Sequence, residues 1–374
     1  MHPSPIKNEW RLNLMENYDS LLPVNEAPFL EGAELDWYEP RRAPFQILGL
    51  YDVMGTPYFK RLPLEVAEKT SAGVRGLNKN TSGGRIRFAT DSSVFAVDFK
   101  YDAFTLRSNV PNFTVGAFDV YEEEAGREVY LGTIRFPMNS PTGYTAKLDL
   151  PGSRMRQITM YFPLYNEVRE LKLGFSRGAF IEPYGGRPYA NELPVVYYGS
   201  SITQGASASR SGLSYQGVIA RRYNLDFINL GFAGNAKGED AIVEYMATMP
   251  MCAFVSDYDH NAPTPEHLAL THKKMYDRIR AKNPTIPYIM ISRPSADYAH
   301  TDNIRRRCIV FDSYRAAIEA GDRNVYFIDG FSLFDDDPDG YCTIDTCHPN
   351  DLGFSKMAQK IGTVLDYALK HITK

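Results

Sequence analysis

The period of the hydrophobic residues changes near residue 180 of this 374-residue chain. Before that point, hydrophobic and polar residues alternate with a period of two, as at 94–101 and 117–121. Turn residues such as those at 81–84 separate these short runs. Many short alternating strands divided by turns are typical of an all-β sandwich or jelly roll. We therefore expect such a domain over residues 1–182, with one helix near residues 62–71.

After residue 193 short β-rich runs alternate with longer helical stretches. The expected strands are 195–198, 226–230, 252–256, 288–292 and 325–329. The expected helices are 213–223, 239–249, 265–282, 303–320 and one from Leu352 onward. This alternation predicts an α/β domain over residues 194–374, with a mostly parallel five-stranded sheet covered on both faces. Two prolines and two adjacent glycines at 182–188 indicate a linker, which we place at residues 183–193.

The balance of charge and the cysteine count exclude several classes of protein. The chain has 41 Lys and Arg against 45 Asp and Glu, so charge gives no reason to expect nucleic acid or an anionic membrane as partner. No run approaches the ~18 apolar residues of a membrane span. Four cysteines are too few to form a disulfide framework in so long a chain. The sequence contains no cofactor-binding or metal-binding motif.

The first residues of the chain bear on its location. They are polar and lack the apolar core of a signal peptide. We therefore expect a cytoplasmic protein, or a secreted one if a leader has been removed. The oligomeric state stays open, a homo-oligomer included.

Polar residues follow the expected strands, where parallel sheets carry their chemistry. The first strand leads into 199–205, where a serine on a sharp turn suits a nucleophile or simply caps a helix. After the third strand, Asn261 has a side-chain N–H for an oxyanion or makes the turn. Before the last helix, Asp345 stands three residues ahead of His348 and can orient its imidazole.

The order of these residues resembles the SGNH, or GDSL-like, hydrolases, whose catalytic domain is flavodoxin-like with three αβα layers. Gly199-Ser200-Ser201 stands where the family has Gly-Asp-Ser, and this alignment makes Ser201 the nucleophile. The family block Asp-x-x-His-Pro is intact at 345–349 and implies a triad of Ser201, His348 and Asp345.

The same resemblance implies an oxyanion hole built from Ser201, Gly234 and Asn261. Two positions depart from the family pattern. Ser200 replaces the usual Asp, and Asp259 stands where a Gly precedes the block-three Asn by two. In one subgroup a β-sandwich with a Gly-x-Asp-Leu-Tyr signature precedes the hydrolase domain, and residues 116–121 are similar to it.

The resemblance implies a serine esterase that works through an acyl-enzyme without a cofactor. The expected partner is a small-molecule or oligosaccharide acyl ester, with acetyl as the acyl group and a carbohydrate as the alcohol. Three alternatives stay open. They are an esterase, thioesterase or lysophospholipase for longer acyl chains, an acyltransferase, and a carbohydrate-binding protein without catalysis.

Overall fold

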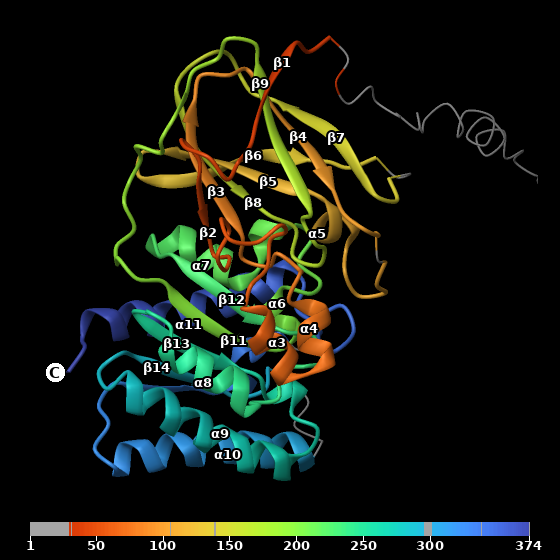
Figure 1. Ribbon diagram of the computed structural model, residues 1–374. Coiled ribbons are helices and arrows are strands. Elements are labelled where there is room, and N and C mark those ends of the chain that lie inside the picture. The colour runs from red at the N-terminus through yellow and green to blue at the C-terminus, as the bar shows by residue number, and fades with distance from the viewer. Residues whose placement is uncertain are drawn as a thin grey trace, which may run out of the picture.

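A computed structural model describes residues 30, 32–104, 106–137, 140–294, 301–337 and 339–373 (Figure 1). A β-sandwich lies at one end of the molecule and a three-layer αβα domain at the other. Residues 1–29, where the N-terminal domain was expected to begin, lie outside the described part. None of the helices described is long and apolar enough to cross a membrane.

The expected all-β half is confirmed as two antiparallel sheets packed face to face. One sheet has, in spatial order, β1 (Leu35–Tyr38), β9 (Glu170–Ser176), β4 (Val94–Lys100) and β7 (Gly143–Asp149). The other has β10 (Ile181–Glu182), β3 (Arg85–Thr90), β8 (Arg156–Tyr161), β5 (Phe118–Glu124) and β6 (Arg127–Ile134), with β2 (Gln46–Leu48) beside β3. Inward residues of both sheets, among them Phe88, Phe95 and Phe175, form one aromatic core. The period-two alternation therefore reports the buried face of each strand.

The expected α/β half is also confirmed. Its five strands are all parallel and lie in the order β12 (Phe227–Gly231), β11 (Val195–Gly199), β13 (Ala253–Asp257), β14 (Tyr288–Ile291) and β15 (Val325–Ile328). One face is covered by α8 (Asp240–Thr248), α9 (Pro265–Lys282) and α10 (Thr301–Glu319). The other is covered by α7 (Tyr215–Tyr223) and α11 (Asp351–Lys370). Along β11 alternate side chains enter opposite cores, so the strand is hydrophobic on both faces.

The single helix expected at 62–71 is wrong in number, because the chain forms two helices there. These are α3 (Leu64–Thr70) and α4 (Ala72–Leu77), separated by Ser71 in an extended conformation (φ −172°, ψ 161°). The Ser71 hydroxyl accepts the Val74 N–H at 3.1 Å and caps α4. Ala67, Val74 and Leu77 lie in the same hydrophobic core as α8, so this N-terminal segment packs on the αβα domain.

Two buried arginines join the halves of the molecule. Arg61 donates to the carbonyls of Leu77 (2.8 Å), Asn229 (3.3 Å) and Gly231, and therefore ties α4 to β12. Arg85 of β3 pairs with the Asp226 carboxylate, and its guanidinium lies 3.9 Å from the centre of the Phe227 ring. These contacts hold the sandwich against the edge of the parallel sheet.

The segment expected to be a linker runs along the sandwich. The backbone N–H of Gly185 donates to Gln157 at 2.7 Å, and that of Arg187 donates to the Glu123 carboxylate. Short helices complete the fold: α5 (Asn112–Gly116), α6 (Ser201–Gln204), η1 (Ser211–Leu213), η2 (Asp259–Asn261) and η3 (Gly330–Phe334). Of these, α5, α6 and η2 adjoin the site described next.

Candidate active site

The turn after β11 presents one serine and buries the other. A Cβ at Gly199 would lie 2.3 Å from the carbonyl oxygen of Asp257, so only glycine fits at the end of this strand. The Ser200 hydroxyl accepts the Ile202 N–H at 3.1 Å and is used up as the cap of α6. Ser201 is the first residue of that helix, and its Oγ lies 2.8 Å from Nε2 of His348.

His348 is held from its other side by Asp345. The Asp345 Oδ2 lies 2.8 Å from Nδ1 of His348, while Oδ1 accepts the backbone N–H of the same residue at 2.7 Å. Partial burial opposes ionisation, but these hydrogen bonds from His348 hold the pKa of the Asp345 carboxyl below its ordinary value. A carboxylate bound to Nδ1 leaves Nε2 free to accept the serine proton. The structure thus brings together three residues that lie up to 147 positions apart in the chain.

The two other predicted residues lie on neighbouring loops at the same edge of the sheet. Gly234, with a φ of +70°, follows β12, and a Cβ there would meet no atom within 4 Å. The Asn261 side chain donates from Nδ2 to the Phe232 carbonyl at 2.9 Å, which joins the loops after β12 and β13. Nδ2 carries a second hydrogen beyond the one in this bond. A role of Gly234 and Asn261 in binding an oxyanion stays a prediction.

The unusual Asp259 supports the loop that carries Asn261. Its carboxylate is buried, pairs with Nη1 of Arg306 at 3.2 Å and accepts the Arg293 backbone N–H at 2.8 Å. Arg306 lies on α10, so the acid ties η2 to that helix. The departure from the family's glycine therefore adds an anchor at this position.

The sandwich contributes a residue that the sequence did not reveal. Nδ2 of Asn109 lies 3.3 Å from both ring nitrogens of His348. Its carbonyl accepts the Ser207 hydroxyl at 2.6 Å, which fixes the loop before α5 against the αβα domain. From the same half, the Tyr165 hydroxyl donates to the Ser201 carbonyl at 3.1 Å. Asn109 and His348 are 239 positions apart, and no local motif connects them.

Replacing Asn109 by alanine is expected to lower kcat for ester hydrolysis about 3- to 10-fold, because the imidazole of His348 loses the amide that packs against its ring and fixes its orientation. The KM for a small ester should change little, because the Asn109 amide contacts the imidazole of His348 and therefore acts on the chemical step rather than on binding of the ester. Steady-state kinetics with p-nitrophenyl acetate measures both constants. Asn112→Ala, at an exposed position of α5, is the matched control and should keep the wild-type kcat. An unchanged kcat in Asn109→Ala would contradict a positioning role.

A second prediction concerns Asp257, a buried acid next to the turn that carries Ser201. Burial raises the pKa of Asp257 to about 8, although the Thr203 hydroxyl bonds to its Oδ2 at 3.2 Å and acts in the opposite direction. The unfolded chain releases this proton near a pKa of about 3.9, so the folded state alone holds it between these values. The contribution of Asp257 to stability therefore falls as pH rises from about 4 to about 8 and levels off above.

Asp257→Asn removes this titration and keeps the neutral shape of the side chain. We expect the variant to gain about 3–4 kcal/mol over wild type on going from pH 5 to pH 8, because each pH unit between the two pKa values is worth about 1.4 kcal/mol. Thermal unfolding at the two pH values measures the difference. Parallel pH profiles of the two proteins would show that Asp257 is ionised in the fold.

His260 and Cys347 lie near the triad but do not form a metal site with the residues that the structure describes. His260 Nε2 lies 3.2 Å from the Pro294 carbonyl, and its Nδ1 lies 3.7 Å from Sγ of Cys347. Burial lowers the pKa of His260 to about 3, so its imidazole is neutral. Within the ranges that the structure describes, no three His, Cys, Asp or Glu side chains are placed to hold a metal ion.

A serine, a histidine and a carboxylate joined at the carboxyl edge of a parallel αβα sheet define a serine hydrolase. Comparison with protein families gives the particular class. Residues 192–366 match the GDSL-like Lipase/Acylhydrolase family, and residues 35–181 match the GxDLY domain, the N-terminus of Esterase_SGNH_hydro-type proteins. The chain belongs to the GDSL-like, or SGNH, hydrolases, in the subgroup that carries this N-terminal domain.

Solved structures share both halves of the fold. A Bacteroides ovatus protein named as a GDSL-like lipase is 27% identical, with a TM-score of 0.81 over 91% of this chain and 99% of that one. The salicylyl-acyltransferase SsfX3 of a tetracycline biosynthetic pathway is 18% identical, with a TM-score of 0.73 over 89% and 97%. An acetyl xylan esterase of Butyrivibrio proteoclasticus is 13% identical, with a TM-score of 0.57 over 90% and 99%. Comparison with curated proteins gave no match.

Proposed function

We propose that this protein is a serine esterase that removes small acyl groups, acetyl foremost, from a carbohydrate. The observation that carries the proposal is the unbroken chain of contacts from Ser201 Oγ to His348 Nε2 and from His348 Nδ1 to Asp345 Oδ2, each 2.8 Å long. This arrangement can activate a hydroxyl as a nucleophile at neutral pH.

In the proposed mechanism, Nε2 of His348 takes the proton of Ser201 as its oxygen attacks the ester carbonyl. Asp345 holds the imidazolium that results. The oxyanion is bound by the backbone N–H groups of Ser201 and Gly234 and by the Asn261 side chain, one donor being worth about 10²–10³ in rate. His348 then gives its proton to the leaving alcohol. A water molecule, deprotonated by the same imidazole, releases the acid and restores the serine.

The choice of an acetylated sugar is supported by the two-part fold shared with the acetyl xylan esterase, whose name supplies the substrate class. The near-neutral net charge of −4 fits an uncharged ester. The likeness to SsfX3 makes transfer to an alcohol acceptor the second activity to measure, because an acyl-enzyme can react with an alcohol as with water.

We expect activity on p-nitrophenyl esters to be highest for acetyl and to fall steadily toward dodecanoyl. Acetylated xylan should release acetate, with the position of cleavage read by mass spectrometry and NMR. Highest activity on the octanoyl ester or a longer one would contradict the proposal that the enzyme removes small acyl groups. Adding competing alcohols and analysing the products separates the two outcomes, because a transferase forms a new ester in place of the free acid.

A further inference from the structure

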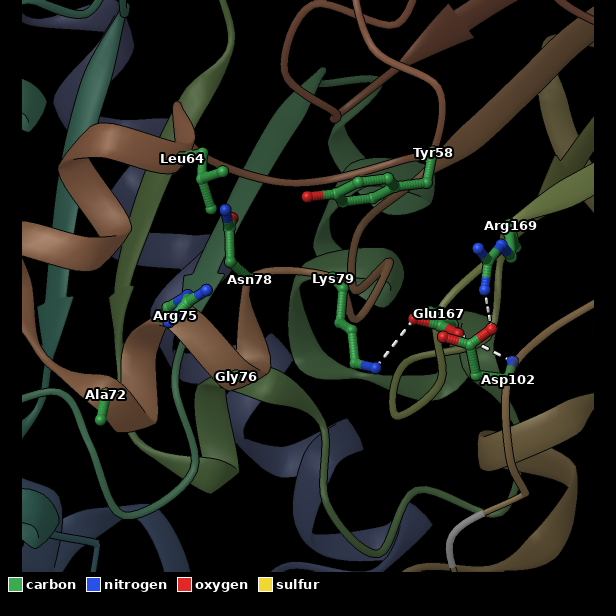
Figure 2. A pocket seen from close by; sticks show the side chains of 10 residues that line it. All are labelled: Tyr58, Leu64, Ala72, Arg75, Gly76, Asn78, Lys79, Asp102, Glu167 and Arg169. Atoms are coloured by element: carbon green, nitrogen blue, oxygen red, sulfur yellow. Dashed lines mark hydrogen bonds and ion pairs between the residues drawn. The ribbon is translucent and has the colours of Figure 1, made fainter.

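A cavity of about 510 Å³ opens between helix α4 and the sandwich (Figure 2). This volume lies in the range of about 300–1,000 Å³ that is usual for ligand pockets. The Tyr58 ring points toward Leu64 and Asn78, with α4 on one side of the cavity and a charged cluster of sandwich residues on the other. The side chains that matter for its chemistry are Tyr58, Leu64, Arg75, Lys79, Asp102 and Arg169.

Segments that line the cavity contact the loops of the candidate active site. Ala72 lines the cavity, and the next residue, Gly73, packs closely on the Asn235 side chain beside Gly234. A Cβ at Gly73 would lie only 1.8 Å from that side chain. Lys79 also lines it, and the neighbouring Asn80 accepts a hydrogen bond of 3.1 Å from Gln204 of α6. The cavity therefore neighbours the loops that carry Gly234 and the nucleophile.

The cavity is lined by an apolar surface, called the platform below, and by charged side chains that are paired with one another or with a neighbouring acid. The half-buried Tyr58 ring and Leu64 supply the apolar surface. Each cation has an acidic partner: Lys79 lies 2.9 Å from Glu167, Arg169 pairs with Asp102, and Arg75 lies 3.3 Å from Glu68.

A site with paired charges does not call for a charged ligand. It offers hydrogen-bond donors and acceptors at the rim and an aromatic face. A sugar has hydroxyls at its edges and C–H groups on its faces, and it matches both features.

We propose that the cavity is a saccharide subsite, which holds a sugar unit of the alcohol portion while the ester reacts at Ser201. This inference rests on the proposed function and adds a binding site outside the triad. The sugar is neutral, since no unpaired lining charge favours an acidic one. The subsite would give the enzyme a preference for oligosaccharide esters over small esters with the same acyl group.

Gly76 offers a way to fill the cavity without disturbing its surroundings. It lines the cavity from α4, and a Cβ there would meet no atom within 4 Å. Gly76→Phe adds a ring to this space, whereas the matched control Gly76→Ala adds only a methyl group. Both replace a helical glycine, so both gain helix propensity and the comparison isolates the effect of filling.

The test measures binding and kinetics on the intact chain. Isothermal titration with xylohexaose and with cellohexaose should show binding of one or both to wild type and Gly76→Ala, and at least tenfold weaker binding to Gly76→Phe. KM for acetylated xylohexaose should rise to a similar extent, with kcat/KM for p-nitrophenyl acetate unchanged. Equal binding and equal KM in the two variants, or no binding of either sugar to wild type, would overturn the subsite.

A second pair of variants removes the platform instead of filling the space. Tyr58→Ala should raise KM for acetylated xylohexaose about 3- to 10-fold, the worth of one aromatic contact. Tyr367→Ala, at an exposed position of α11, is the control and should leave KM unchanged. If the wild type does not hydrolyse p-nitrophenyl acetate, the proposed esterase activity itself is refuted. If it does, but Tyr58→Ala and Gly76→Phe leave KM for acetylated xylohexaose unchanged, only the subsite is refuted.

Discussion

Ser201→Ala is expected to lower kcat/KM for p-nitrophenyl acetate by about 10³- to 10⁶-fold, the usual cost of removing a triad nucleophile. The reason is that no other hydroxyl stands 2.8 Å from Nε2 of His348 among the described residues of the site. The fold should be unaffected, since the change deletes one oxygen. Steady-state kinetics and the melting temperature together check the result.

Ser200→Ala is the matched control, because it removes a hydroxyl one position earlier. That hydroxyl caps α6 through Ile202, so its loss should cost about 1 kcal/mol of stability and leave most of the activity. A serine-reactive phosphonate followed by peptide mass spectrometry should label Ser201. Label on Ser200 or elsewhere, or full activity of Ser201→Ala, would show that the nucleophile is misassigned.

Arg61→Ala is expected to destabilise the protein by about 3–5 kcal/mol, because it leaves buried carbonyls without a donor and opens a cavity. The guanidinium is buried, binds the carbonyls of Leu77, Asn229 and Gly231, and lies 4.3 Å from the centre of the Phe232 ring. Burial lowers the pKa of Arg61 to about 9, which shows how costly its charge is in this place. Thermal or chemical unfolding measures the loss.

The variant should also lose activity at temperatures where it stays folded. Arg61 holds Gly231, and the loop from this residue leads to Gly234. Arg177→Ala removes an exposed arginine that pairs with Glu34, and as a control it should change stability by less than about 1 kcal/mol. A loss this small in Arg61→Ala would mean that the carbonyls find water or other donors.

The αβα half could be predicted from the sequence because each of its elements is hydrophobic in a regular pattern. The strands at 195–198 and 252–256 were expected to within a residue or two, since both lie in the middle of the sheet and are hydrophobic on both faces. Polar residues at strand ends indicated the edge that carries the chemistry. The spacing of Asp345 and His348 indicated only that the acid could orient the imidazole. Their place in a triad and the choice of Ser201 over Ser200 needed the family resemblance.

Features that depend on tertiary packing could not be predicted. Helix α4 contains Gly73 and Gly76, which lower its propensity, and it forms because Val74 and Leu77 enter the core beside α8. The contact between Asn109 and His348 joins two domains, and no residue beside Asn109 in the sequence indicates it. The cavity is formed by residues from three separate segments, whose proximity no periodicity reveals.

The packing of α3 and α4 on α8 has a consequence for recombining parts of such enzymes. The Pro and Gly stretch at 182–188 suggests a natural cutting point, yet a fragment starting there would lack Ala67, Val74 and Leu77 from its own core. Its exposed apolar surface would favour aggregation. A chimera that takes its sandwich from a relative must therefore keep residues 61–80 with the hydrolase half, so that the unit of exchange is discontinuous in sequence.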